Sequence, residues 1–233
     1  MAQKKTPGIT ANQALAEWVK QHPDQRLDEV EEISLQFQAP PIKTLSDRLA
    51  QLTNCKKLSI STNNIEEIGW LPPRLEILAI GRNLLKKLDK IDKVAGSLQQ
   101  LWMSYNNVKS LAPLVACKKL RVLYAAHNNI DKLSEIDRLS QLPNLEDLVL
   151  IGNPLYIDLN KKGTYKTEII KKLKKLQVLD GQALTGMQST TEEPAATGAA
   201  TGNATAGASG NASGAGSRSV SPRADSANQG NRA

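Results

Sequence analysis

Residues 98–111 read LQQLWMSYNNVKSL, and in this stretch apolar side chains and one asparagine stand at fixed places. Those places are Leu98, Leu101, Met103, Asn106, Val108 and Leu111. Trp102 and Tyr105 are large aromatic residues that fall between the apolar positions. The stretch therefore raises two questions: what the spacing builds, and why two aromatic residues lie outside it.

The same spacing occurs five times, and the repetition decides the fold. The other copies are CKKLSISTNNIEEI at 55–68, LEILAIGRNLLKKL at 75–88, LRVLYAAHNNIDKL at 120–133 and LEDLVLIGNPL at 145–155. Their asparagines follow one another at intervals of 20, 23, 22 and 25 residues, within the range of about 20 to 29 residues that leucine-rich repeats show. A weaker first copy begins at Ile33 and Leu35. The sequence predicts an α/β leucine-rich-repeat solenoid with a parallel sheet on its concave side.

Helical caps are expected at both ends, because terminal repeats would otherwise expose the core. Thr10, followed three residues later by Gln13, is typical of a helix start, and Trp18 belongs to the apolar side of that helix. We therefore predict an N-terminal helical cap over 1–27 and repeats with a C-terminal cap over 28–184. The closing helix would bury Ile169, Leu173 and Leu176.

Residues 185–233 differ sharply from the rest of the chain. They consist mainly of Ala, Gly, Ser, Thr and Asn, a composition that cannot bury enough apolar surface to offset the entropy of ordering. We predict a disordered low-complexity tail. Three basic and three acidic residues cancel in this tail, so the whole excess charge of +7 belongs to residues 1–184.

Strand alternation sends the residues beside the repeat leucines outward. These positions hold an apolar set that we call the outward cluster: Ile77, Trp102, Tyr105, Val122, Tyr124, Val149 and Ile151. Adjacent strands lie about 4.8 Å apart, so Trp102 is expected beside Tyr124. Soluble proteins seldom leave such patches without a partner, and Trp and Tyr are enriched among interface hot spots. The outward cluster is the predicted partner-binding surface.

Catalysis has little support in the sequence. His22 and His127 are far apart, and neither has a neighbour at the spacing of a metal site or a nucleophile. Cys55 and Cys117 stand where small core residues are expected. We predict a protein that is not an enzyme, with no cofactor and no metal site, in a reducing intracellular compartment. No apolar run approaches the length of about 20 residues that spans a membrane.

The repeats resemble one family in particular, the leucine-rich-repeat light chains of outer-arm axonemal dynein, the light chain 1 family. The resemblance runs from about residue 10 to residue 181 and rests on GRN at 81–83, LWMSYN at 101–106 and GNPLY at 152–156. After Gly181 the sequence departs from the family, whose members usually continue into a charged helix.

The resemblance implies a non-catalytic subunit that binds an axonemal outer-arm dynein heavy chain near its microtubule-binding stalk tip and modulates the motor. It implies a location in the cytoplasm and cytoskeleton, in the axoneme of a cilium or flagellum. Arg82, in the GRN motif, lies at the margin of the outward cluster and joins it as an expected heavy-chain contact. No membrane or nucleic-acid partner is expected.

Lysines gather in the closing helix and define a second candidate surface. Lys171, Lys172, Lys174 and Lys175 surround its apolar positions. Such runs usually form a solvated face. The other reading is a contact with acidic tubulin, reached when the light chain is carried close to the filament.

Two other functional classes remain open. A regulatory subunit of a protein phosphatase would use the same repeats, more often in a longer array with an acidic concave face. An RNA-protein scaffold would use the basic excess of the folded part. Competition between RNA and a heavy-chain stalk fragment would separate this reading from the dynein one.

Overall fold

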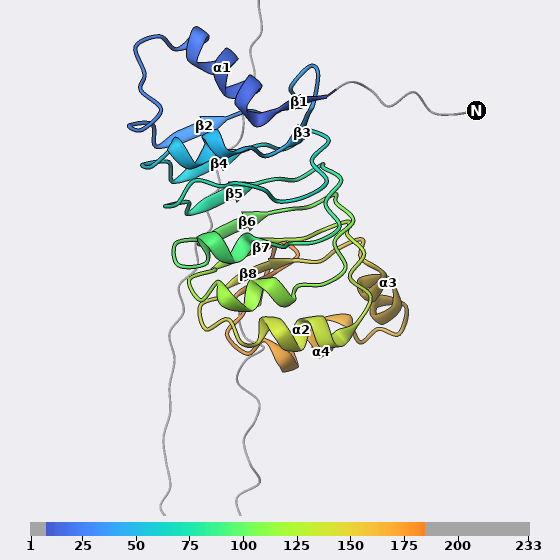
Figure 1. Cartoon of the computed structure of the whole chain (residues 1–233). Helices are drawn as coiled ribbons and strands as arrows, with labels where there is room; N and C mark the ends of the chain where they lie inside the picture. Colours follow the sequence, from blue (N-terminus) through green and yellow to red (C-terminus); the bar gives the residue numbers. More distant parts are fainter. Residues whose placement is uncertain (1–7, 185–233) are drawn as a thin grey trace, which may run out of the picture. The chain divides into compact units, whose positions relative to one another are not determined.

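The computed structural model describes residues 8–184. In this part the chain winds as a stack of similar turns, each contributing one short strand to a common sheet (Figure 1). The predicted disordered tail, 185–233, lies outside the described residues.

The main sheet contains eight strands and follows the order of the repeats. Its strands are β2 (Glu32–Ser34), β4 (Lys57–Ser59), β5 (Ile77–Ala79), β6 (Gln100–Trp102), β7 (Val122–Tyr124), β8 (Asp147–Val149), β9 (Val178–Leu179) and β10 (Gln182–Ala183). Every pairing from β2 to β9 is parallel, and only β10 runs antiparallel, against β9. The predicted leucine-rich-repeat fold is confirmed, with β2 supplied by the weaker first copy.

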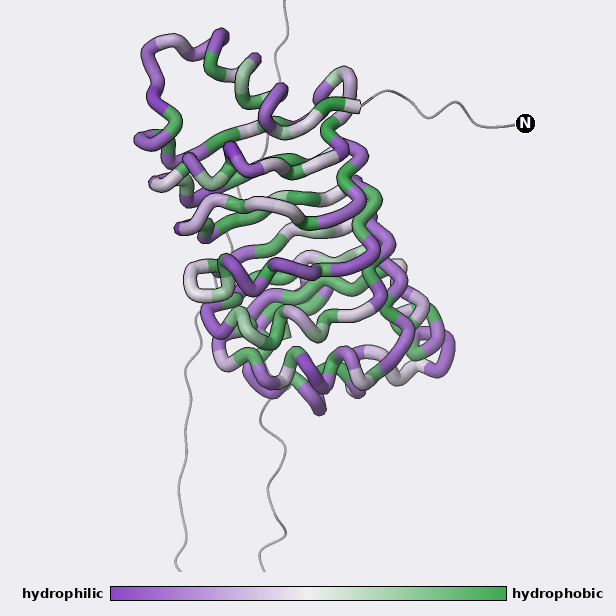
Figure 2. Tube along the Cα trace, in the orientation of Figure 1, coloured by the Kyte–Doolittle hydropathy of each residue, from purple (hydrophilic) through white to green (hydrophobic). Residues whose placement is uncertain are grey.

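The middle residue of each strand points into the core. Leu58, Leu78, Leu101, Leu123 and Leu148 are directly paired in register from one strand to the next, and all five are fully buried. Apolar residues recur at the same place in successive turns of the stack (Figure 2). Each repeat thus covers the apolar side of its neighbour, which is why one repeat alone would not be stable.

The repeat asparagines form a second, polar ladder inside the turns. Asn106 illustrates it: its side-chain oxygen accepts from the N–H of Leu85 at 3.0 Å, and its amide nitrogen donates to the carbonyls of Ile80 and Met103, each at 3.0 Å. Equivalent bonds are made by Asn63, Asn83, Asn128 and Asn153. The amide both donates and accepts, so it satisfies buried backbone groups of two adjacent repeats.

Short helical segments return the chain on the side away from the sheet. They are the 3-10 helices η1 (Asp47–Gln51), η2 (Ile91–Val94) and η3 (Ala112–Ala116), and the α-helix α2 (Leu133–Leu139). Their length grows toward the C-terminal half, where α2 packs beside the closing helix α4 (Tyr165–Lys172) (Figure 1).

The N-terminal cap is the helix α1 (Ala11–Gln21), which follows β1 (Ile9–Thr10). The predicted start is confirmed, because Thr10 and Gln13 form a reciprocal capping box. Trp18 packs against the core but stays half-buried, and its ring stacks on His22 at 4.2 Å. It is therefore an edge residue of the core rather than a central one.

The N-terminal cap is tied to the first repeat. β1 pairs with β3 (Ile42–Thr44). Asn12 bonds through its amide nitrogen to Asp47 at 3.0 Å and accepts from the N–H of Arg48 at 3.2 Å. These contacts join residues before and after position 27. The predicted boundary between an N-terminal cap over 1–27 and repeats from residue 28 therefore stays a prediction.

The C-terminal cap consists of α3 (Pro154–Lys161), α4 and the β9–β10 hairpin. Ile169, Leu173 and Leu176 are buried, as predicted, but α4 ends at Lys172, so Leu173 and Leu176 lie beyond the helix in which the sequence placed them. Asp180 satisfies the end of β8, because one carboxylate oxygen accepts from the N–H groups of Leu150 and Ile151 at 2.7 and 3.1 Å. At the positions equivalent to Leu150 in the earlier repeats, the acceptor is a backbone carbonyl of the next strand.

Candidate functional site

The outward side of the main sheet carries a column of residues that changes in size along the stack. Ser59, Ala79, Trp102, Tyr124 and Val149 are paired in register from β4 to β8. The predicted neighbourhood of Trp102 and Tyr124 is confirmed: their rings lie 6.2 Å apart between centroids with 16° between planes. In this offset stack each of the two large rings restricts the position of the other.

Tyr124 also joins the stack to the next strand. Its hydroxyl donates to Asp147 at 2.8 Å. That hydrogen bond, helped by partial burial and by the carboxylate charge, raises the pKa of Tyr124. Among the described residues, the indole nitrogen of Trp102 and the second carboxylate oxygen of Asp147 are buried without a hydrogen-bond partner. A donor and an acceptor on this face thus remain unused.

A second column lies along the rim, where the chain turns after each strand. The rim column consists of Phe37, Thr62, Arg82, Tyr105, His127 and Gly152, and every one of these residues has a positive φ, between 50° and 77°. Non-glycine residues seldom adopt this region. Backbone hydrogen bonds between neighbouring turns hold it here, such as Arg82 N–H to Ser104 at 2.8 Å and Tyr105 N–H to Ala126 at 2.9 Å.

Three side chains of the rim column form one continuous stack. The Arg82 guanidinium lies 4.4 Å from the Tyr105 ring centroid, and Tyr105 stacks on His127 at 4.5 Å with 13° between ring planes. The next position is Gly152, where an added Cβ would come within 2.4 Å of the His127 ring. Glycine at this place therefore leaves room for the end of the stack.

All eight expected heavy-chain contacts lie on this face or its rim. Tyr105 and Ile151 are exposed, at 45% and 38%, and Arg82 is exposed as well. Half-buried residues make up the rest: Ile77, Trp102, Val122, Tyr124 and Val149. The structure brings these residues together as one surface, and their role as heavy-chain contacts stays a prediction.

Phe37 belongs to the same face, and the sequence analysis missed it. Its side chain is 72% exposed, and with Trp102 and Tyr124 it surrounds a hollow of about 390 Å³ in the concave face. A signal was present in the sequence: Phe37 stands two residues after Leu35, as Tyr105 stands two residues after Met103. Extending the rim column to the weaker first repeat would have found it.

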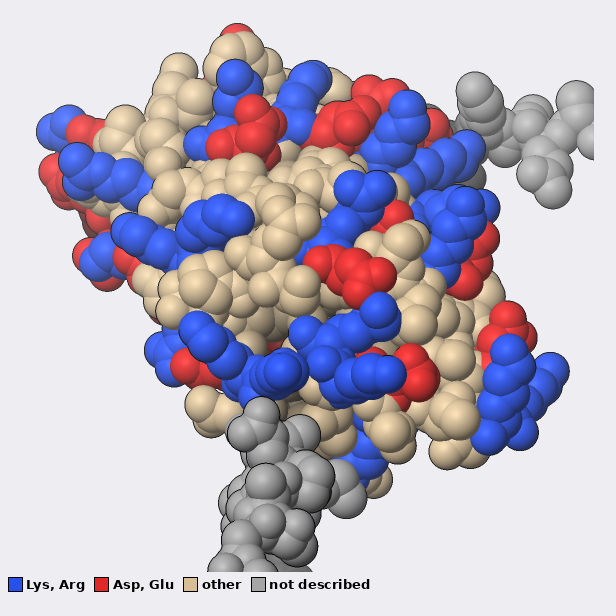
Figure 3. Space-filling view, turned by 90° about the horizontal axis from the view of Figure 1, so that it is seen from below, with Lys and Arg blue, Asp and Glu red and all other residues tan. Residues whose placement is uncertain are grey.

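The lysine-rich cap surface is less available than the sequence suggested. Lysine and arginine side chains gather on the side that α2 and α4 occupy, with acidic groups between them (Figure 3). Lys172 is only 24% exposed and forms an ion pair with Asp137 of α2, and Lys175 donates to the Pro143 carbonyl at 3.3 Å. Lys171 and Lys174 are exposed. Their contact with tubulin remains untested.

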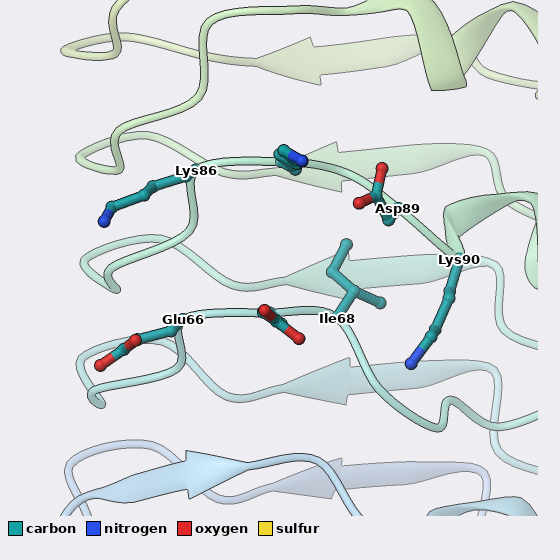
Figure 4. A pocket seen from close by; sticks show the side chains of 7 residues that line it. Glu66, Ile68, Lys86, Asp89 and Lys90 are labelled. Atoms are coloured by element: carbon teal, nitrogen blue, oxygen red, sulfur yellow. The ribbon is translucent and has the colours of Figure 1, made fainter.

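A further hollow, of about 260 Å³, lies where the chain leaves the turns of two adjacent repeats (Figure 4). Glu66 of one repeat lies near Lys86 of the next, with Asp89 and Lys90 farther along the chain. These charged side chains are exposed, and only the buried Ile68 lines the hollow with an apolar group. This region has the character of a solvated charged edge.

The remaining chemical groups offer little for catalysis. Burial raises the pKa of both Cys55 and Cys117 to about 11, so neither thiol is activated. Within residues 8–184, no three His, Cys, Asp or Glu side chains gather as metal ligands would. The helices of that same part are too short or too polar to cross a membrane.

Comparison with known proteins gives three related findings. A family model described as leucine-rich repeats (2 copies) matches residues 96–138. Dynein axonemal light chain 1 of Chlamydomonas reinhardtii is 45% identical over 158 residues, covering 66% of this chain and 80% of that protein. The protein of the same name in Homo sapiens is 41% identical over 174 residues, covering 74% and 91%.

Among solved structures, a leucine-rich-repeat protein of Leptospira interrogans is similar, with a TM-score of 0.53 at 25% sequence identity. The match covers 65% of this chain and 37% of that protein. It agrees with the repeat architecture described above.

Proposed function

The chain belongs to the axonemal dynein light chain 1 family, and we propose that it binds a dynein heavy chain near the microtubule-binding tip of the stalk. Membership makes it a dynein light chain of the axoneme, the cytoskeletal core of a cilium or flagellum. Its role there is non-catalytic: it modulates the activity of the motor that it binds.

One observation carries the proposal, the aromatic and aliphatic side chains on the outward side of β6, β7 and β8. Trp102 and Tyr124 are half-buried and stacked on one another in this surface. Large rings held in place before binding lose little entropy when a partner covers them. They are also the residue types that contribute most at interfaces.

The unused hydrogen-bonding atoms support the same conclusion. The Trp102 indole nitrogen and one Asp147 oxygen have no partner within the described residues, and a buried group without a partner costs about 1 to 3 kcal/mol. Both atoms are buried, so a docking heavy chain would have to shift the Trp102 or Asp147 side chain to supply these bonds and recover that free energy. The exposed groups of the face, Arg82 and Tyr105 among them, offer a partner polar contacts directly.

Affinity purification from cilia or flagella tests the proposal. A tagged chain should recover an outer-arm dynein heavy chain, and the recombinant protein should bind a purified stalk-tip fragment in calorimetry. Recovery of a phosphatase catalytic subunit without any dynein heavy chain would overturn the proposal, as would displacement of the stalk fragment by RNA.

The exposed cap lysines extend the proposal to tubulin. Lys171 and Lys174 project from the C-terminal cap, and their charge would attract an acidic filament surface over about 8 to 10 Å before salt screens it. This contact is secondary, because Lys172 and Lys175 already have partners within the protein.

A further inference from the structure

In the outward column of the concave face that runs from Ser59 to Val149, the residues are large on β6 to β8 and small on β4 and β5. The part with small residues has no role in the proposed function described above. From β6 to β8 the outward positions carry Trp102, Tyr124 and Val149, whereas at β4 and β5 they carry Ser59 and Ala79. Ser59 and Ala79 are buried at 7% and 5% exposure, so they form a floor rather than a contact surface. The face steps down between β5 and β6.

Phe37 borders the step on its far side, so the step forms a shallow, open hollow. Phe37 rises from the turn after β2, and Trp102 and Tyr105 rise from the other side. The floor between them includes Ser61 and Gly81, where an added Cβ would come within 3.1 Å of the Ser104 carbonyl. At about 390 Å³ the hollow falls in the lower part of the usual size range of ligand clefts.

A single cation marks the rim of this hollow. Arg82 lies against Tyr105, which is itself stacked on His127, so its guanidinium is held in position. Arg82 has no ion pair with any residue of 8–184. Lys57, by contrast, is already paired with Glu32 at 2.8 Å. An apolar hollow with one ordered, unpaired guanidinium complements an apolar group next to a carboxylate.

We propose that the docking heavy-chain segment inserts one bulky apolar side chain into the hollow between Phe37 and Trp102 and places a carboxylate beside Arg82. This inference rests on the proposed function and specifies the chemistry of the partner. A nucleic acid fits less well, because strand binding needs several phosphate contacts and this hollow offers one unpaired cation.

Filling the hollow tests the apolar half of the proposal. Ser61→Phe places a ring on the floor, and we expect it to weaken binding of a stalk-tip fragment by tenfold or more. Ser134→Phe is the matched control, because Ser134 is exposed on α2, away from the concave face. Should Ser61→Phe unfold the protein, Phe37→Ala, which removes an exposed wall, should also lower the affinity.

Reversing the charge tests the other half. Arg82→Glu should weaken binding by tenfold or more at low salt, and the loss should shrink as salt is added. Lys86→Glu, at the exposed charged edge, should change affinity little. Exchanging the responsible heavy-chain Asp or Glu for Lys should restore binding to the Arg82→Glu protein.

The outcomes separate this inference from the proposed function. If the wild-type chain binds no heavy-chain fragment, the proposed function fails. If Trp102→Ala weakens binding while Ser61→Phe, Phe37→Ala and Arg82→Glu all bind like wild type, the heavy chain docks elsewhere on the face and this inference is wrong.

Discussion

The inner and outer sides of β6 and β7 are formed by the same two tripeptides, yet they differ in how completely their side chains are buried and hydrogen-bonded. Inside, Leu101 and Leu123 are fully buried. Outside, Trp102 and Tyr124 are half-buried, and the Trp102 indole nitrogen has no partner in the described part of the chain. The inner side is closed by the fold itself, whereas the outer side is left partly open to solvent.

The asparagine ladder makes the contrast clearer. Asn106 sits at 6% exposure and makes three hydrogen bonds of 3.0 Å. Asp147, on the other side of the sheet, accepts from Tyr124 with one oxygen, and its other oxygen has no partner among residues 8–184. Polar groups that maintain the repeat are fully paired, and the unpaired ones gather where a partner is proposed to bind.

The largest expected effect is a loss of stability caused by a substitution on the inner side of the sheet. Leu101→Ala removes a fully buried side chain from the centre of the stack, and such changes cost about 2 to 5 kcal/mol of unfolding free energy. Denaturant unfolding should show this loss, while Trp102→Ala, one residue later, should lose much less. Equal losses would mean that the two sides contribute alike to folding.

The next effect falls on the outer side and concerns binding. Trp102→Ala or Tyr124→Ala should weaken association with the heavy-chain fragment by about 2 to 4 kcal/mol, the scale of interface hot spots. Calorimetry measures this loss, and circular dichroism should show a nearly unchanged melting temperature. Full affinity in both variants would remove these residues from the interface.

A smaller effect is expected at the C-terminal cap, where the Tyr165 hydroxyl donates to Asp180 at 2.6 Å. Tyr165→Phe removes this donor to a carboxylate and should cost about 1.5 to 3 kcal/mol at neutral pH. Asp180 would keep its bonds to Leu150 and Ile151, so the fold should persist.

The same variant should respond differently to alkali. Burial first, and then Asp180, raise the pKa of Tyr165, so the folded state keeps this proton after the unfolded state loses it near about pH 10. Wild-type stability should therefore fall as pH rises above that value. The difference from Tyr165→Phe should narrow there. Denaturant unfolding at a series of alkaline pH values measures this difference. If the difference in unfolding free energy between wild type and Tyr165→Phe stayed constant above about pH 10, the explanation would be wrong.

The smallest effect is expected at the lysine surface. Reversing charge at Lys171 and Lys174 should lower cosedimentation of the light chain and its stalk fragment with microtubules at low salt, without affecting fragment binding. Exposed charge pairs contribute at most about 1 kcal/mol, so a salt series is needed to detect the change. Identical cosedimentation of variant and wild type would leave these lysines as a solvated surface.

Most of the fold could be predicted from the sequence, because the same spacing of apolar residues and asparagine recurs in successive repeats. The five asparagines, the inward leucines and the capping box at Thr10 lie where the pattern indicated. The outward columns were also predictable, because alternation along a strand determines which side a residue faces.

Side-chain pairing on the surface was not predictable in the same way. The stack of Arg82, Tyr105 and His127 depends on positive φ values in successive turns, which the repeat spacing does not report. Lys172 looked like a free cation in sequence, but it pairs with Asp137, 35 residues earlier. Such contacts depend on how α2 and α4 pack, which no local pattern encodes.

The β9–β10 hairpin has a consequence for assembly. A stack of parallel strands presents an open edge, and identical copies could in principle join there end to end. Here Asp180 and Gly181, at φ values of 52° and 77°, turn the chain back so that β10 pairs antiparallel with β9. The last row of N–H and C=O groups is occupied by a strand of only two residues. The hairpin thus leaves only a very short edge strand at this end of the sheet, which disfavours end-to-end pairing with the sheet of another copy.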